Sequence, residues 1–261
     1  MIPTRIFKRV SFAASSRTFL CIIVLVFGPL SHAQQHQATV RIAVASNFIK
    51  PMQQLIERFE QQNSYSVLAS YSASGKLYAQ IIHGAPFDIF LSADEVKPKM
   101  LIKANKTANE QSYTYALGRL ILWSSDANFI SNSPDILKQN TFNKLALANP
   151  KFAPYGQAAV EVLRNLSLLE QSKSKWVMGE SISQTYQFVA TGNADIGFIA
   201  FSQKPATGSY WLIPDTLYSP IKQNAVLLKR GEKNKAAQAF FTFLQSIEAK
   251  NIIQSHYYNV D

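Results

Sequence analysis

Four short segments of this sequence combine open hydrogen-bond donors with an expected helix start. They are Ala45-Ser46-Asn47, Ser72-Ala73-Ser74-Gly75, Pro154-Tyr155-Gly156 and Glu180-Ser181-Ile182. The first N–H groups of a helix have no acceptor within the helix and carry partial positive charge, so they suit an anion. For any one segment alone, a serine that merely caps its own helix is the simpler explanation. Two such segments in each half of the chain favour an anion-binding cleft.

Catalytic and metal-ion chemistry finds little support in the same sequence. Beyond the N-terminal leader described next, the histidines are His36, His83 and His256, and none is spaced with another residue as a metal pair. HExxH and GxSxG motifs are absent from the sequence. Tyr257-Tyr258 is similar to the paired tyrosines of some ferric-ion binders, but packing of the terminus explains it better. We therefore expect no enzyme, no cofactor and no site for a bare metal cation.

The first 33 residues have the features of an export signal. A basic start without acidic residues precedes the apolar run 19–27, and Ser31-His32-Ala33 fits the small-x-small rule for signal peptidase. The apolar run is shorter than the roughly 20 residues of an ordinary membrane-spanning helix. We expect cleavage after Ala33 and a periplasmic location. The single cysteine, Cys21, would be removed with the signal, so the exported chain must rely on a packed core.

Charge and composition exclude several other classes of protein. The 261 residues carry a formal charge of +10, with 47% apolar and 16% charged residues, which is ordinary globular composition. Removal of residues 1–33 leaves 22 basic against 16 acidic residues, a net charge of +6. This modest charge favours encounters with anions. There is no basic stripe with interleaved aromatic residues, so no nucleic-acid partner is expected.

Apolar runs and helical periodicity alternate along the rest of the chain. Expected strands cover 40–45, 66–70, 89–93, 120–123, 145–148, 196–201 and 225–228. Expected helices cover about 48–59, 77–83, 156–169, 181–191 and 235–253. Such alternation predicts an α/β fold with parallel strands, and the restart of the pattern near residue 120 predicts two lobes with a cleft between them. A ligand is expected at the carboxyl ends of the strands, where helices begin.

Several of these segments resemble the periplasmic molybdate-binding proteins, the receptors of molybdate ABC transporters. The most specific is 84–94, which is similar to the family's GAP-x-D-x-F-x-SAD pattern. Residues 42–48 resemble the family's first strand and the strand-to-helix connection that follows it. Residues 71–77 resemble the second such connection. The stretches 147–156 and 193–197 resemble segments of the second lobe. The resemblance covers the chain from about Val40 to the C-terminus.

The resemblance implies a two-lobed type II periplasmic-binding fold that closes on a bare tetrahedral oxyanion. Lobe one would comprise 38–118 plus about 216–261, and lobe two about 119–215. Carried over by position, Ser46 and Ser74 would supply hydroxyl and backbone donors. Tyr155 and Ile182 would supply backbone N–H groups, and Asn47 a further donor as in one branch of the family. Many members also place a tyrosine hydroxyl on the ion. This chain has Ala200 at that position and lacks the hydroxyl, so either Tyr155 replaces that donor or the site has one donor fewer.

The implied function is an extracytoplasmic receptor that binds molybdate or tungstate and delivers it to the membrane permease of an ABC transporter, with the receptor a monomer. Neutral donors suit a fully deprotonated dianion, whereas hydrogen phosphate would leave its proton without an acceptor. Sulfate would be excluded by size, and tungstate is close to molybdate in size. The alternatives are a receptor for sulfate or another oxyanion, an exported enzyme acting on a small anionic substrate, and a sensor lobe that signals to a membrane partner.

Overall fold

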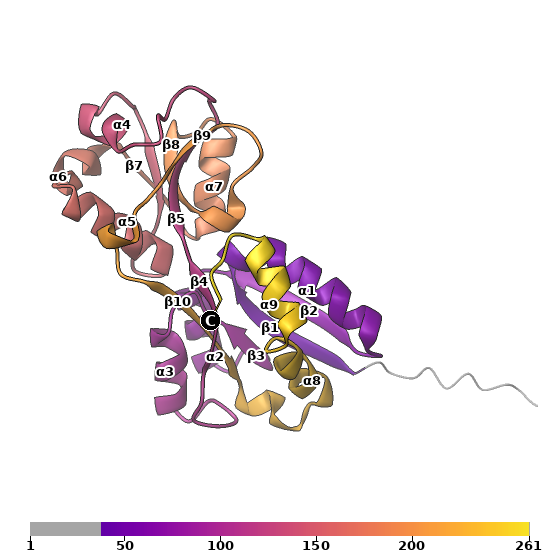
Figure 1. Ribbon diagram of the computed structural model, residues 1–261. Coiled ribbons are helices and arrows are strands. Elements are labelled where there is room, and N and C mark those ends of the chain that lie inside the picture. Colours follow the sequence, from indigo (N-terminus) through magenta and orange to yellow (C-terminus); the bar gives the residue numbers. More distant parts are fainter. Residues whose placement is uncertain (1–37, 261) are drawn as a thin grey trace, which may run out of the picture. The chain divides into compact units, whose positions relative to one another are not determined.

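The chain builds two five-stranded sheets, each with helices on its faces (Figure 1). The computed structural model describes residues 38–260, so the expected signal peptide at 1–33 lies outside the described residues. Within the described part, no helix has the length and apolar character needed to cross a membrane. We call each sheet with its helices a lobe.

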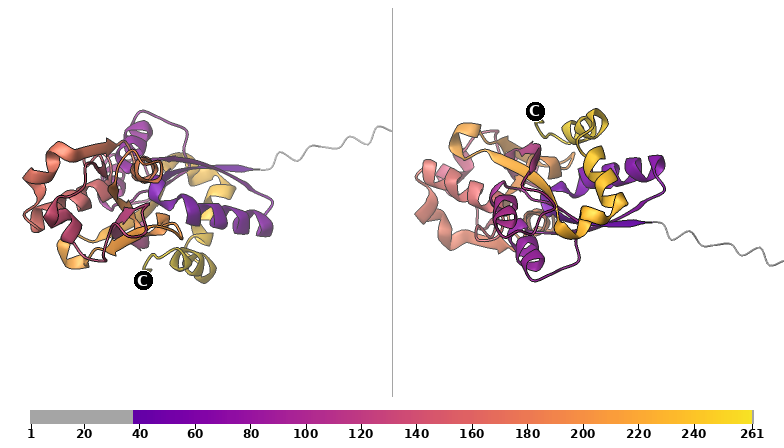
Figure 2. Two further views of the ribbon diagram at one scale, coloured as in Figure 1. Left: turned by 90° about the horizontal axis from the view of Figure 1, so that it is seen from above. Right: turned by 90° about the horizontal axis from the view of Figure 1, so that it is seen from below.

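The first lobe is built on a sheet of strand order β2-β1-β3-β10-β4. Its strands are β1 (Thr39–Ala45), β2 (Ser66–Ser72), β3 (Ile89–Leu91), β4 (Tyr113–Gly118) and β10 (Ile221–Leu227). β1 pairs in parallel with β2 and β3, while β10 runs antiparallel to β3 and β4. Its helices are α1 (Ile49–Gln62), α2 (Ser74–Ile82), α3 (Val96–Lys103), α8 (Lys235–Phe243) and α9 (Ile247–Ser255). α9 packs beside α1, as both views of Figure 2 show.

The second lobe repeats this plan with strand order β7-β6-β8-β5-β9. Its strands are β5 (Leu120–Ser124), β6 (Leu145–Ala148), β7 (Trp176–Gly179), β8 (Ile196–Ala200) and β9 (Ser209–Leu212). β6 pairs in parallel with β7 and β8, and β5 runs antiparallel to β8 and β9. Its helices are α4 (Asp135–Gln139), α5 (Pro154–Asn165), α6 (Leu169–Ser172) and α7 (Ile182–Ala190).

Short 3-10 turns complete the chain and mark its connections. They are η1 (Ser46–Phe48), η2 (Lys173–Lys175), η3 (Phe201–Gln203), η4 (Asp215–Leu217) and η5 (Lys229–Lys233). The chain passes from the first lobe to the second between β4 and β5, across Arg119, and returns between η4 and β10. β10 is therefore the strand on which the chain re-enters the first sheet (Figure 1).

The expected α/β fold with two lobes is confirmed, and each lobe places two helix starts at the carboxyl ends of neighbouring parallel strands. In the first lobe β1 leads into η1 and α1, and β2 leads into α2. In the second lobe β6 leads into α5, and β7 leads into α7. Since parallel neighbours end at the same edge of a sheet, this topology gathers the starts that follow each strand pair.

Two helix expectations were wrong in extent. The helix expected over 235–253 is two helices, because Ser246 caps a new start by accepting a hydrogen bond from the Ala249 N–H. The helix expected over 156–169 ends at Asn165, and Ser167 adopts a left-handed conformation with φ 60°. Strands β4, β7 and β9 were not expected, because short runs with half-exposed residues show no clear alternation.

Candidate functional site

A small pocket lies between the two lobes, where the four helix starts meet. About 180 Å³ of space between atoms lies there, part of it open to solvent. Its lining residues come from those starts and from the end of β3: Ala45, Ser46, Asn47, Ser72, Ala73, Ser74, Ala93, Ala153, Pro154, Tyr155 and Ile182. All five residues expected to bind a ligand are in this list, so the structure brings them together. Ala200 ends β8 and is not among the lining residues.

Three of the four helix starts at the pocket have alanine in the capping position. Ala45, Ala73 and Ala153 precede η1, α2 and α5, and none of these starts has a side-chain cap. Alanine is a poor cap, costing about 1 kcal/mol relative to serine or aspartate. A capping side chain would occupy the first N–H groups of the helix, so alanine leaves those groups open toward the pocket.

Ser46 presents a buried hydroxyl without a partner. The residue is 4% exposed, and its Oγ has no hydrogen-bond partner among the described residues. An unpaired buried hydroxyl costs roughly 1–3 kcal/mol, so such atoms are rare in folded proteins. Because Ser46 does not cap its own turn, the capping explanation fails for this residue. Its hydroxyl is available to a ligand in the pocket.

Ser74 also does not cap its own helix. Its Oγ accepts a hydrogen bond from the Ala93 N–H at 2.9 Å, across the sheet edge. The acceptor role leaves the hydroxyl hydrogen free to donate. The Ala93 contact therefore fixes the position of the oxygen while its hydrogen remains available to a ligand.

The second lobe contributes mainly backbone donors. Tyr155 and Ile182 are among the first residues of α5 and α7, where helix geometry gives the N–H groups no intrahelical acceptor. Ser181 caps α7, because its Oγ accepts a hydrogen bond from the Gln184 N–H at 3.3 Å. The cap explanation thus holds for Ser181 and not for the two serines of the first lobe.

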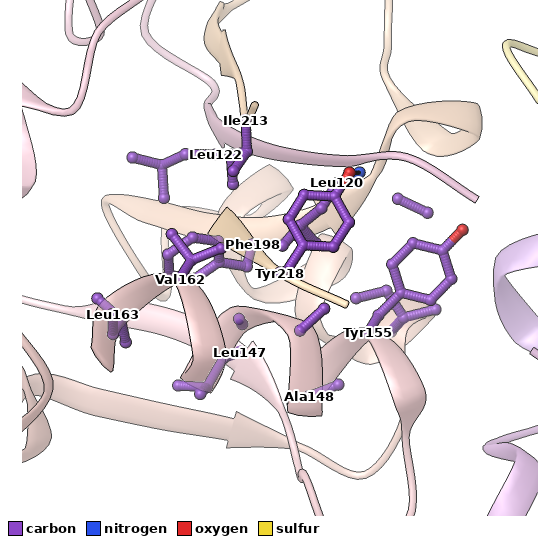
Figure 3. Packing of buried hydrophobic residues seen from close by; sticks show 14 of the residues in the cluster. Leu120, Leu122, Leu147, Ala148, Tyr155, Val162, Leu163, Phe198, Ile213 and Tyr218 are labelled. Atoms are coloured by element: carbon purple, nitrogen blue, oxygen red, sulfur yellow. Dashed lines mark hydrogen bonds between the residues drawn. The ribbon is translucent and has the colours of Figure 1, made fainter. Parts of the chain in front are cut away.

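The side chains of Asn47 and Tyr155 are directed into a buried hydrogen-bond network. The Asn47 amide donates to Gln223 Oε1 at 2.9 Å and to Tyr258 Oη at 2.8 Å. The Tyr155 hydroxyl accepts from Gln223 Nε2 at 3.0 Å. Figure 3 shows this hydroxyl turned away from the apolar residues of the second-lobe core, such as Val162. Both amide hydrogens of Asn47 already have acceptors, so the group it offers the pocket is its backbone N–H.

The electrostatics of the pocket come from dipoles rather than from charges. Within the described part of the chain, no charged side chain lines it. Burial raises the pKa of Tyr155 well above its usual value, so the phenol stays protonated at neutral pH. At the rim, Lys76 of the first lobe pairs with Glu180 of the second at 2.6 Å. Glu180 is mostly exposed, so this pair contributes little energy.

Hydrogen bonds join the two lobes around the pocket. The Gly75 N–H donates to the Phe152 carbonyl at 2.9 Å, and the Ser183 hydroxyl donates to the Ser46 carbonyl at 2.9 Å. A Cβ on Gly75 would lie 3.0 Å from the Phe152 Cα, so a larger residue would hinder this approach. The structure is therefore a closed arrangement in which both lobes contact each other at the pocket.

A wider cavity that shares Ala93 and Pro154 with the pocket is a poorer candidate for an anion. Its lining includes Asp94, Glu95 and Glu161, and Lys222 is its single basic residue. Three carboxylates would repel an anion. Among the described residues there is also no group of three or more His, Cys, Asp and Glu side chains that could hold a metal ion.

Sequence reasoning missed the residues that surround the site without lining it. Gln223, Tyr115, Tyr258 and Ser202 contribute to the buried network. One sequence signal could have pointed to Gln223: the polar pair Gln223 and Asn224 directly precedes the apolar run 225–228. The structure buries both residues of this pair. The two adjacent tyrosines near the C-terminus differ in burial: Tyr258 is 3% exposed, whereas Tyr257 is 51% exposed.

Comparison with known proteins identifies the family. Residues 40–259 match the model of the bacterial extracellular solute-binding proteins. The chain belongs to this family. It is 44% identical over 244 residues to the molybdate-binding protein ModA of Azotobacter vinelandii, covering 92% of this chain and 96% of the relative. It is 43% identical over 218 residues to ModA of Rhodobacter capsulatus, covering 83% and 86%.

Solved structures of solute-binding proteins share the fold. The periplasmic molybdate-binding protein of Azotobacter vinelandii superposes with a TM-score of 0.83 at 34% identity, covering 85% of this chain and 99% of that one. The sulfate-binding protein SubI of Mycobacterium tuberculosis superposes with a TM-score of 0.73 at 13% identity, covering 85% and 86%. At that identity the second likeness concerns the fold alone. Together these matches establish the two-domain solute-binding fold for this chain.

Proposed function

We propose that this protein is a periplasmic receptor that binds molybdate or tungstate and delivers it to the permease of an ABC transporter. The observation that carries the proposal is the Ser46 hydroxyl, which is buried at the pocket beside uncapped helix starts and has no partner within residues 38–260. The two ModA relatives, both named as molybdate-binding, support the choice of ligand.

The donor set matches a fully deprotonated tetrahedral dianion. The hydroxyls of Ser46 and Ser74 and the backbone N–H groups of Asn47, Tyr155 and Ile182 all donate hydrogen bonds. Preorganised neutral dipoles stabilise a desolvated anion without the low selectivity of a fixed cation. Hydrogen phosphate would need an acceptor for its proton, and a lining that offers donors to the ligand penalises it.

Binding requires both lobes, since the serine hydroxyls lie in the first and the N–H groups of Tyr155 and Ile182 in the second. We infer that the ion favours the closed arrangement, with motion at the two chain crossings. The protein acts as a monomeric carrier, not as an enzyme, and needs no cofactor. We infer that the Tyr155 hydroxyl does not replace the tyrosine donor missing at Ala200, because it accepts from Gln223 Nε2 and is also hydrogen-bonded to Tyr258.

Thermal unfolding with added oxyanions tests the proposal. Molybdate and tungstate at about 100 times their dissociation constants should stabilise the protein by roughly 2.7 kcal/mol and raise its melting temperature. Sulfate and phosphate at the same concentrations should raise it little. Equal shifts from sulfate would make this a general oxyanion receptor, and no shift from any of the four ions would refute the proposal.

A further inference from the structure

We propose that Gln223 is a latch for lobe closure, so that a residue outside the pocket lining sets how long the ligand stays bound. The inference rests on the function proposed above. Gln223 is a positioning residue: it is fully buried on β10, and it is not among the residues that line the pocket. Its two polar atoms instead contact side chains that do line it.

Each end of the Gln223 amide faces a different part of the site. In the first lobe, Oε1 accepts from Asn47 Nδ2 at 2.9 Å and from the Tyr115 hydroxyl at 3.0 Å. Toward the second lobe, Nε2 donates to the Tyr155 hydroxyl at 3.0 Å. Gln223 thus joins a residue at the start of η1 to a residue at the start of α5.

A second interlobe connection lies beside the first. The Ser202 hydroxyl, from η3 of the second lobe, donates to the Asn47 carbonyl at 3.0 Å and contacts Tyr258 Oη at 2.9 Å. The Tyr258 hydroxyl also donates to the Asn47 carbonyl at 3.0 Å. Asn47 is therefore held by both lobes at once. The bonds from Gln223 to Tyr155 and from Ser202 to Asn47 cross between the lobes, so separation of the lobes would break them.

The backbone is shaped to allow this contact. The β4–β10 ladder changes register between Gln223 and Asn224, which leaves Tyr115 as the extra residue on β4. Such a bulge redirects side chains, and here Tyr115 and Gln223 meet. At Gly118, where β4 ends, an added Cβ would clash with Tyr155 Oη and would lie 2.7 Å from Gln223 Nε2. Only glycine leaves room there for the pair.

An interaction present only in the closed state slows ligand release and leaves capture unchanged. Replacement of Gln223 by methionine keeps the length of the side chain and removes its hydrogen bonds. A net hydrogen bond of ordinary strength corresponds to roughly 2- to 13-fold in an equilibrium constant. Gln223→Met should therefore raise the dissociation rate of molybdate by about 3- to 10-fold, with an association rate within about twofold of the parent.

The experiment is stopped-flow tryptophan fluorescence of the full protein with molybdate, tungstate and sulfate, using whichever ion the parent binds most tightly. Ser209→Ala is the control: its buried hydroxyl accepts from the Ile130 N–H and donates to the Asp126 carbonyl, within the second lobe and away from both chain crossings and the pocket lining. It should leave both rates within about twofold. Gly118→Ala, which forces Tyr155 and Gln223 apart, should raise the dissociation rate at least as much as Gln223→Met.

Faster release from Gln223→Met together with unchanged release from Ser209→Ala supports the latch. Parental release from Gln223→Met overturns it, as does an equal effect of both variants, since that would be a general loss of packing. If the parent binds none of the ions, the proposed function fails, and X-ray scattering of the ligand-free proteins then decides the latch. A larger radius of gyration for Gln223→Met than for Ser209→Ala would support it, and equal radii would overturn it.

Discussion

Replacing Ser46 with alanine should separate ligand affinity from protein stability. The Ser46 hydroxyl is buried and has no partner among the described residues, so the ligand-free protein gains nothing from it. Alanine removes an unsatisfied polar atom, and the free energy of unfolding should stay at the parental value or rise by about 1 kcal/mol. In the complex, the same hydroxyl donates to a desolvated dianion. A hydrogen bond to a charged group contributes about 1.5–3 kcal/mol, so molybdate should bind roughly 10- to 150-fold more weakly.

Two serine variants serve as controls for this prediction. Ser181→Ala removes a helix cap and should lower the free energy of unfolding by about 1 kcal/mol, with affinity within about twofold. Ser74→Ala should lower both quantities, because its hydroxyl also accepts from the Ala93 N–H. Calorimetric titration measures affinity, and urea unfolding without ligand measures stability. A Ser46→Ala protein that is less stable yet binds molybdate as tightly as the parent would refute the reasoning.

Three further outcomes follow from the site. Tyr155→Phe should weaken binding by about 2- to 10-fold, less than Ser46→Ala, because its hydroxyl is engaged by Gln223 Nε2 and Tyr258. An equal loss in titration would place that hydroxyl on the ion. Molybdate affinity measured by calorimetry should be constant within about twofold from pH 6.5 to 9. Burial raises the pKa of Tyr155 above its usual value of 10.0, so the phenol deprotonates only beyond this range. A tenfold decline in affinity across pH 7 would reveal a titrating cation in the site. Glu180→Gln should change affinity less than about threefold, since its ion pair with Lys76 is exposed, and a larger effect at low salt would contradict this.

The parts of the site that the sequence could predict are those fixed by local chain chemistry. A buried parallel strand followed by a helix places its first N–H groups at the sheet edge, so the segments around Ser46, Ser74 and Tyr155 could be located from alternation. Ile182 follows β7, which was not expected, and the choice of individual donor residues came from the family resemblance. The sequence could not tell which serine caps a helix. That distinction depends on long-range partners, such as the Ala93 N–H that engages Ser74.

The closure network was beyond sequence reasoning for the same reason. Gln223 lies 176 positions from Asn47 and 68 from Tyr155, and a bulge in the β4–β10 ladder brings their side chains together. Neither the bulge nor the space at Gly118 leaves a periodic trace in the sequence. The division of the C-terminal helix at Ser246 left a trace, a serine that can cap, but apolar periodicity runs on across it.

The most direct test of the account is a crystal structure of the protein grown with molybdate, with the metal located by its anomalous scattering. We expect one molybdenum peak in the pocket between the lobes. Its oxygens should lie within hydrogen-bond distance, about 2.7–3.2 Å, of the Ser46 and Ser74 hydroxyls and of the Tyr155 and Ile182 backbone nitrogens. A peak elsewhere on the protein, or an ion in the pocket that leaves the Ser46 hydroxyl unbonded, would contradict the account.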